Sequence, residues 1–337
     1  MKKVTIKDVG EYADVSPSTV SRVISNDKRI SDETKKKVRE AIKKLGYHPN
    51  AIARSLVTQK TKSMGLILSR PAEAAFANPF FPGIIQGIAS IAQEEEYNLL
   101  LAAAKDYHRE HEEALDMLRN GKVDGVILMA PRVNDDIIQQ LLDFNYPFVL
   151  IGRSIELRDI PIVNNDNIKA AYDAVKFLIK KGQQKIAFLS GPEEYVVSRD
   201  RLTGYKKALK ENGIKVNSDL IKYSSFTYEG GYENTMNLLK SKNDIDAVFA
   251  VDDMIASGAL RAAQNMGLNV PEELAVMGFN DDPMAVHLRP ALSTVKIPIV
   301  EMGKKAAQML LQLIHDDDYK GEKIIIPTKI IERDTTN

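Results

Sequence analysis

The chain has 337 residues, with 46 Lys and Arg against 46 Asp and Glu, and it contains no cysteine. A chain of this length exceeds one average domain and can bury a large core. The absence of cysteine excludes disulfide frameworks, cysteine-ligated zinc sites and thiolate catalysis. The N-terminus shows no apolar segment typical of an export signal, and no apolar run approaches the ~20 residues of a membrane span. We therefore expect a cytoplasmic protein without a membrane partner.

The charges are unevenly distributed along the chain. Residues 1–60 hold 14 Lys and Arg against 7 Asp and Glu, a net charge of +7, and the remaining residues hold 32 against 39, a net charge of −7. Such an asymmetry indicates an N-terminal segment that contacts phosphates. A basic solvated tail is the alternative, and the apolar periodicity of the same segment disfavours it.

Three short helices are predicted in this basic segment. Thr5 and Asp8 have the spacing of a capping box, which predicts that the first helix begins after Thr5. The second helix begins at Ser16-Pro17, because serine is a favoured N-cap and proline is tolerated at the first helical position. The third begins at Ser31 and ends at Gly46.

The second helix has one apolar and one polar face. Val20, Val23 and Ile24 are expected to face the core, and the opposite face then carries Pro17, Ser18, Ser21 and Arg22. Small polar groups with one arginine suit a helix in a DNA major groove, where arginine can bind guanine through two hydrogen bonds. The alternative is a three-helix bundle with a solvated polar face.

A short segment with weak helical character follows at residues 51–56. It begins after a His-Pro break at 48–49, with Asn50 as a cap, and it is too short to be a stable helix alone in water. DNA and a second copy of the chain could order it. Ala53 permits close approach, and Leu56 could act as an apolar wedge between base steps in a minor groove. The predicted DNA contacts are Thr5, Ser16, Pro17, Ser18, Ser21, Arg22, Asn50, Ala53, Arg54 and Leu56.

Beyond residue 63, apolar runs alternate with helical stretches. Strands are predicted at 64–68, 99–104, 126–129, 148–151, 186–189, 247–251 and 274–279, and helices at 82–95, 108–119, 168–180, 199–211, 228–240 and 253–266. This alternation is typical of parallel sheets covered on both faces. Two groups of strands predict two doubly wound lobes, with ligand at the carboxyl ends of the strands.

The body carries no motif typical of an enzyme. It lacks GxxxxGK[ST], GxGxxG and GxSxG, so we expect no catalysis and no cofactor. The sequence His108-Arg109-Glu110-His111 lacks an evident third metal ligand and is interpreted as a solvated helix face. Asp252-Asp253 and Asp281-Asp282 each follow a strand, where a polar ligand is usually held, and they are not interpreted as a metal site.

Several segments resemble the lac repressor/galactose repressor family. The head and hinge carry VTIKDVGEYADVSPSTVSRVISN and GYHPNAIARSL, and the body carries NPFFPGIIQGI, VNNDN, AFLSGP, RLTGYKKAL and AVMGFNDDPMA. The resemblance covers essentially all residues in the family's order. Within the family, LIGRSIE together with GFNDDP most resembles the maltose-operon repressors of Gram-positive bacteria.

The resemblance implies a fold and its boundaries. It implies an α/β protein with an N-terminal helix-turn-helix head and hinge helix at 1–58, a linker at 59–63, and a two-lobed body like a periplasmic binding protein at 64–337. The chain is expected to recross between the lobes near 290–295 and near 320–323. Lobe 1 then comprises approximately 64–160 plus 293–320, and lobe 2 approximately 161–290 plus 321–337.

The resemblance also implies a function. It implies a transcriptional repressor of a maltose or maltodextrin operon, which binds a pseudo-palindromic operator as a homodimer and is controlled by a sugar bound between the lobes. The tail KIIIPTKIIERDTTN lacks a heptad repeat, so no coiled-coil tetramerisation segment is expected. A sugar-binding transport receptor without a DNA role and a constitutive architectural DNA-binding protein are the alternatives. The basic head disfavours the first, and the large body disfavours the second.

Family correspondence places the effector contacts at the ends of strands, with the phenylalanine pair in a loop of lobe 1. Aromatic faces can cover the C–H side of a sugar, and charged and amide groups can bind vicinal hydroxyls. Asn280 stands where lac and purine repressors carry aspartate, so a different sugar or a corepressor remains an alternative ligand. For the aromatic residues the alternative is core packing, and for Arg201 it is an ion pair with a neighbouring acid. The predicted contacts are Phe80, Phe81, Arg153, Arg201, Phe226, Asp252 and Asn280.

Overall fold

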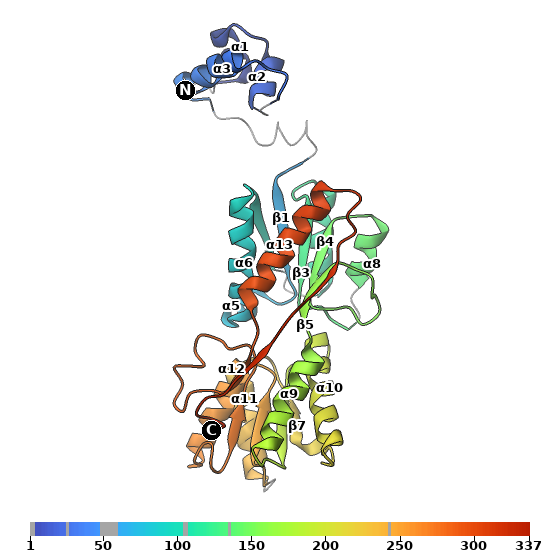
Figure 1. Cartoon of the computed structure of the whole chain (residues 1–337), viewed down its shortest axis with the longest axis vertical. Helices are drawn as coiled ribbons and strands as arrows, with labels where there is room; N and C mark the ends of the chain where they lie inside the picture. The colour runs from blue at the N-terminus through green and yellow to red at the C-terminus, as the bar shows by residue number, and fades with distance from the viewer. Residues whose placement is uncertain (1–3, 25–26, 48–59, 104–106, 134–135, 242–243) are drawn as a thin grey trace. The chain divides into compact units, whose positions relative to one another are not determined.

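The computed structural model describes residues 4–24, 27–47, 60–103, 107–133, 136–241 and 244–337. The chain divides into two units, Met1–Thr61 and Lys62–Asn337, and the division falls inside the predicted linker (Figure 1). In the described part of the chain, no helix is long and apolar enough to cross a membrane.

The first unit contains a bundle of three helices, α1 (Ile6–Ala13), α2 (Pro17–Ile24) and α3 (Asp32–Leu45). Its core consists of residues from all three helices, namely Val9, Val20, Val23, Val38 and Ala41. The predicted capping box is confirmed, because the Thr5 amide donates to the Asp8 carboxylate at 2.7 Å and the Asp8 amide donates to the Thr5 hydroxyl at 3.4 Å. Gly46 ends α3 in the left-handed conformation with φ 63°.

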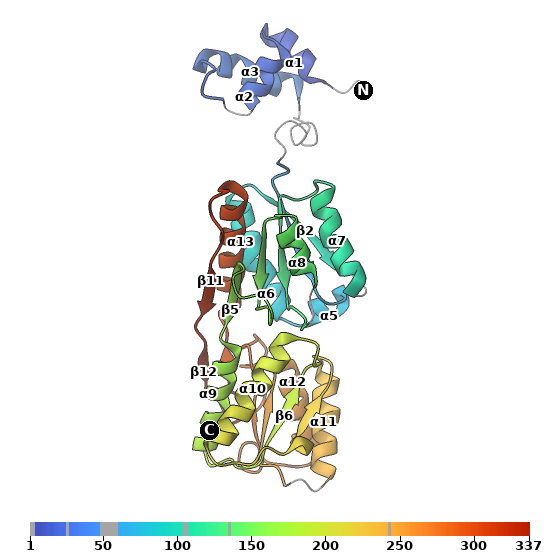
Figure 2. The same cartoon turned by 90° about the vertical axis from the view of Figure 1, so that its right-hand side faces the viewer.

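Lobe 1 of the body is built on a parallel sheet of six strands in the order β11-β5-β4-β3-β1-β2. The strands are β1 (Ser63–Leu68), β2 (Asn98–Ala103), β3 (Gly125–Met129), β4 (Phe148–Ile151), β5 (Ile162–Asn165) and β11 (Lys323–Ile326). The helices are α5 (Ala72–Ala77), α6 (Phe80–Glu94), α7 (Tyr107–Arg119), α8 (Asp136–Asp143) and α13 (Ile299–His315). Helices α6 and α13 pack on one face, and α7 and α8 pack on the other (Figures 1 and 2).

Lobe 2 is built on a parallel sheet of four strands in the order β7-β6-β8-β9. The strands are β6 (Ile186–Ser190), β7 (Ile221–Tyr223), β8 (Ala247–Ala250) and β9 (Ala275–Met277). The helices are α9 (Asn167–Lys180), α10 (Val196–Glu211), α11 (Tyr228–Lys240), α12 (Asp253–Asn265) and the 3₁₀ turn η1 (Ser218–Leu220). Beside this sheet, β10 (Thr294–Lys296) pairs antiparallel with β12 (Lys329–Ile331). Two doubly wound lobes are thus confirmed.

The chain crosses between the lobes three times, a few residues later than predicted. Strand β5 pairs with β4 and β11, so lobe 1 extends to residue 165 and also includes 323–326. Strand β10 forms its bridges with lobe 2, so lobe 2 extends to residue 296. The approximate boundaries at 160 and 321 differ from the structure because β5 and β11 pair in parallel within the sheet of lobe 1, and the boundary at 290 differs because β10 pairs with β12 beside the sheet of lobe 2.

Helix α6 begins two residues before its predicted start at residue 82. Phe80 and Phe81 therefore lie in the first turn of a helix, and their predicted placement in a loop was wrong. The short helix α5 precedes them and was also not predicted. These changes matter for the site, because a helical first turn fixes the directions of both rings.

Candidate DNA-binding and ligand-binding sites

The predicted DNA contacts of the head lie on the exposed face of α2 and at the residues that precede α1 and α2. The Ser16 hydroxyl caps the helix by accepting from the Thr19 amide at 3.2 Å, and it lies 2.8 Å from the Ser18 hydroxyl. Because Val20 and Val23 are buried, the opposite side of α2 is left open to a groove. The exposed predicted contacts are Thr5, Ser16, Pro17, Ser18, Ser21 and Arg22.

The other predicted DNA contacts are Asn50, Ala53, Arg54 and Leu56. They lie outside the residues that the structure describes. Their role in the minor groove stays a prediction from the sequence.

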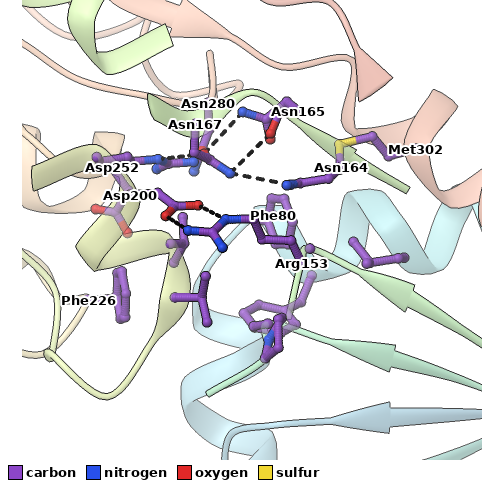
Figure 3. A pocket seen from close by; sticks show the side chains of 18 of the residues that line it. Phe80, Arg153, Asn164, Asn165, Asn167, Asp200, Phe226, Asp252, Asn280 and Met302 are labelled. Carbon is purple, nitrogen blue, oxygen red and sulfur yellow. Dashed lines mark hydrogen bonds and ion pairs between the residues drawn. The ribbon is translucent and has the colours of Figure 1, made fainter. Parts of the chain in front are cut away.

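A pocket of about 670 Å³, counted to its open mouth, lies between the two lobes of the body (Figure 3). The structure brings together at this pocket all the predicted effector contacts, namely Phe80, Phe81, Arg153, Arg201, Phe226, Asp252 and Asn280. Lobes 1 and 2 both contribute to it, so a ligand held here contacts both lobes at once.

The aromatic residues of the pocket differ in how much of each ring is accessible. Phe81 is 1% exposed and packs edge-to-face against Phe80, with 5.6 Å between the ring centroids. Phe226 approaches Gly191 so closely that a Cβ there would lie 2.3 Å from the ring. Core packing therefore describes Phe81, whereas Phe80 and Phe226 are half-buried.

An ion pair joins the two lobes at the pocket. Arg153 follows β4 of lobe 1, and its guanidinium donates to both carboxylate oxygens of Asp200 on α10 of lobe 2, at 2.8 Å through Nε (Figure 3). The hydrogen bond to Asp200 raises the pKa of Arg153 above its ordinary value. Opening the lobes would break this pair, so it stabilises the arrangement in which the lobes are together.

A second hydrogen bond between side chains also joins the lobes. The Asn78 amide of lobe 1 donates to Asp252 of lobe 2 at 3.0 Å. The other oxygen of Asp252 caps α12 by accepting from the Ile255 amide at 2.8 Å. Burial raises the pKa of Asp252, while these hydrogen bonds and the nearby arginines oppose the rise. Asp252 is therefore held in one orientation from both sides of the pocket.

The backbone also joins the lobes beside the pocket. The Val196 amide donates to the Pro131 carbonyl at 3.1 Å, and the Val133 amide donates to the Glu194 carbonyl at 2.8 Å. The structure thus shows the lobes in contact through backbone as well as side-chain groups. Small changes in the angle between the lobes would alter several bonds together.

Arg201 is buried in lobe 2 and has neutral partners. Its guanidinium donates to the Asn167 side-chain oxygen at 3.0 Å and to the Val251 carbonyl, and it lies 3.6 Å from the centroid of the Phe279 ring. Burial lowers the pKa of Arg201 to about 9, so the side chain stays protonated at neutral pH. In the part of the chain that it describes, the structure does not show a direct ion pair of Arg201 with an acid. The nearby aspartates stabilise its charge only through space.

Three asparagines form a polar cluster where β5 ends. Asn167 accepts from the Asn165 amide at 3.1 Å and donates to the Asn164 oxygen at 3.3 Å. In the sequence these asparagines stand in the motif VNNDN directly after an apolar run, which is the position of a polar group at the end of a buried strand. The lining residues that the sequence analysis missed include Arg70, Asn78, Asn164, Asn165, Asn167 and Asp200.

Two further aspartates, Asp253 and Asp282, lie together in lobe 2. Asp253 accepts from the Thr294 hydroxyl at 2.6 Å and from the Asp282 amide at 2.7 Å. Burial raises the pKa of Asp282 to about 7. In the described part of the chain, no cluster of three or more His, Cys, Asp or Glu is suited to a metal ion.

Comparisons with known proteins cover both units. The head matches the family model described as bacterial regulatory proteins, lacI family, over residues 5–50. The body matches the model described as periplasmic binding proteins and sugar binding domain of LacI family, over residues 61–334.

The chain is similar along its whole length to individual members. It is 38% identical over 335 residues to the transcriptional regulator MalR of Streptococcus pneumoniae, covering 98% of this chain and 99% of MalR. The solved CelR–cellobiose complex is 32% identical, with a TM-score of 0.77, covering 99% of this chain and 100% of CelR. The lac repressor dimer bound to operator and an anti-inducer is 28% identical, with a TM-score of 0.88 and 99% coverage of both chains.

Proposed function

The chain belongs to the LacI family of bacterial regulatory proteins, and from this premise we propose that it represses a maltose or maltodextrin operon under the control of a sugar. The observation that carries the proposal is the pocket between the lobes, joined on one chain to a helix-turn-helix head. Membership of this family of regulatory proteins disfavours the alternative of a transport receptor without a DNA role.

The groups around the pocket support a sugar as the ligand. Phe80 and Phe226 offer half-buried rings to the C–H faces of a pyranose, and the Asn280 amide lines the same space. Arg153 and Asp252 each join the lobes at the pocket wall, so a ligand bound there touches the groups that hold the lobes together. A few oriented polar groups within an apolar lining are typical of specific small-molecule sites.

Similarity to MalR favours an α-linked glucose disaccharide or a longer maltodextrin. The CelR–cellobiose complex, which matches the chain over nearly its full length, supports a β-linked disaccharide as the second candidate. The two disaccharides differ in the configuration of the glycosidic carbon, α in one and β in the other. Their two glucose rings therefore meet at different angles, and a pocket can distinguish them by this angle.

On the DNA side, the proposal uses the exposed face of α2. Two copies of the chain would place their α2 helices in adjacent major grooves, as a two-fold operator requires. The likeness to a lac repressor dimer bound to operator supports both the dimer and the DNA partner. In the proposed complex, Arg22 binds a base edge, and Leu56 from each copy opens a base step between the half-sites.

The ligand controls DNA binding only if it prefers one arrangement of the lobes. A sugar that contacts both lobes changes the equilibrium of the bonds between Arg153 and Asp200 and between Asn78 and Asp252. The resulting shift in lobe angle reaches the head through residues 59–63. Induction and corepression correspond to opposite signs of the same coupling free energy.

Isothermal titration of the full chain with maltose, maltotriose, cellobiose, sucrose and ribose tests the ligand. Maltose or maltotriose should bind with the highest affinity. Binding of cellobiose alone would move the assignment to the second candidate. Binding of ribose or sucrose without either glucose disaccharide would contradict both.

A further inference from the structure

Arg70 occupies the pocket and was not singled out by the sequence. It follows β1 of lobe 1, lines the pocket and is 9% exposed. A buried arginine at the end of a parallel strand lies where ligands of two-lobed α/β proteins are held. The question is what its guanidinium does there.

The Arg70 guanidinium is surrounded by the rings of Phe81, Tyr195 and Phe226. We call these three rings the aromatic cage. The guanidinium carbon lies 3.8 Å from the ring centroid of Phe226, 4.9 Å from that of Tyr195 and 5.1 Å from that of Phe81. Phe81 belongs to lobe 1, while Tyr195 and Phe226 belong to lobe 2. The cage therefore holds the guanidinium in one orientation only while the lobes are together.

The charge of Arg70 lacks a close counter-ion. The charged residues that line the pocket are three arginines and two aspartates, and the aspartates are engaged elsewhere, Asp200 by Arg153 and Asp252 by Asn78. Among the described residues, no carboxylate lies within 4.0 Å of Arg70, and its buried Nε has no hydrogen-bond partner. Burial lowers the pKa of Arg70, and this is opposed by the Tyr195 hydroxyl, through charge and hydrogen bonding, and by Asp252, which acts only through space.

A buried cation with an unpaired donor is costly, and its donors are directional. A guanidinium packed against aromatic rings keeps its N–H groups in its own plane, so they can bind two oxygens side by side. Aromatic contacts do not satisfy these donors. A ligand that brings two acceptor oxygens into the pocket would satisfy them, and vicinal sugar hydroxyls have the required spacing.

We propose that Arg70 is a specificity-determining residue, which donates in-plane hydrogen bonds to a vicinal pair of hydroxyls of the sugar. This inference rests on the proposed function, because it assigns the wall of the same pocket that recognises the sugar. It also explains why the cage spans both lobes, since Arg70 is aimed at the ligand only when Tyr195 and Phe226 close over it. A sugar that lacks one of those hydroxyls leaves the guanidinium unsatisfied and binds weakly.

The test compares sugar binding by four full-length proteins in isothermal titration. Wild type is compared with Arg70→Met, which keeps an apolar stem without donors, and with Arg70→Lys, which keeps a cation without the planar fork. Arg158→Met is the matched control, because Arg158 is exposed and does not line the pocket. Thermal unfolding followed by circular dichroism establishes that each variant is folded, and Arg70→Lys replaces Arg70→Met if the latter unfolds.

Maltose affinity should fall about 10- to 100-fold in Arg70→Met and at least about tenfold in Arg70→Lys, the usual effect of losing hydrogen bonds to a charged donor. It should change less than about twofold in Arg158→Met. A series of monodeoxy maltoses then separates contact from structure. At least one of them should lose about tenfold on wild type and almost nothing on the Arg70 variant, as coupling between two contacting groups requires.

Equal losses for every deoxy sugar on wild type and variant would overturn the proposal, because a merely structural arginine gives that pattern. Unchanged or tighter maltose binding by Arg70→Met would also overturn it, since Arg70 would then compete with the sugar for the cage. If wild type binds cellobiose and not maltose, the maltose assignment fails separately. The same comparison with monodeoxy cellobioses then decides the role of Arg70.

Discussion

Removal of the Arg153–Asp200 ion pair should shift the lobes towards an open arrangement. The pair spans the two lobes, with 33% of the Arg153 side chain and 5% of the Asp200 side chain exposed. Exposed pairs contribute about 0–1 kcal/mol, whereas breaking a buried pair by removing one partner costs about 3–5 kcal/mol. For this largely buried pair with two hydrogen bonds and one partly exposed partner we expect about 2 kcal/mol, which is roughly 30-fold in the equilibrium between closed and open lobes.

Arg153→Met and Asp200→Asn should both show this shift, and sugar affinity should fall by up to the same factor if only closed lobes bind. The double variant should lose less than the sum of the single losses, because it leaves no buried charge without a partner. Lys169→Ala is the control, since its partner Asp173 lies on the same helix of lobe 2.

The chain offers a direct assay because it contains no cysteine. Dyes attached through Asn120→Cys in lobe 1 and Lys210→Cys in lobe 2, both at exposed positions, report the distance between the lobes by single-molecule energy transfer. The variants should populate the low-transfer state more than the control does. If both single variants keep the wild-type distribution within about twofold, the ion pair does not hold the lobes together and the reasoning is refuted.

Four further outcomes are expected. Arg22→Ala should lose about 1–3 kcal/mol of operator binding and much less on random DNA in fluorescence anisotropy; equal losses would make Arg22 a phosphate contact. Leu56→Ala should reduce DNA bending in a circular-permutation gel without changing sugar affinity, and unchanged bending would exclude the wedge. Gly258→Ala should lower the melting temperature of the body, because a Cβ there lies 2.0 Å from the Tyr228 carbonyl, and an unchanged melting temperature would contradict this packing. Burial raises the pKa of Asp282 to about 7, so the contribution of its protonated form to stability is present at pH 4 and is lost as the pH rises through 7. Each pKa unit of this shift corresponds to about 1.4 kcal/mol. Asp282→Asn should therefore flatten this part of the pH–stability curve measured by urea unfolding, and an unchanged curve would contradict the assignment.

Local features of the chain could be predicted because local chemistry determines them. The capping box at Thr5 depends on residues three positions apart, and the apolar runs that form β1 and β3 are buried on both faces of a sheet. The predicted effector contacts reached the pocket because family correspondence supplied their positions. These parts of the fold need no knowledge of long-range pairing.

The remaining features depend on pairing between distant residues. The points where the chain crosses between the lobes depend on the pairing of β5 with β11, whose paired residues are about 160 positions apart. The periodicity of the sequence does not contain that information. The same holds for Asn78 with Asp252, which are 174 positions apart. Arg70 has no local signal beyond its place after a strand, and its importance arises only when rings from both lobes surround it.

The most direct test of the account measures DNA affinity as a function of sugar. An operator selected by the full chain from random DNA is titrated in fluorescence anisotropy, with and without saturating maltose or maltotriose, at one fixed salt concentration. We predict a change of at least about tenfold in Kd for the operator and a much smaller change for random DNA, because the sugar prefers one arrangement of the lobes. An unchanged operator Kd at a sugar concentration that titration calorimetry shows to be saturating would contradict it.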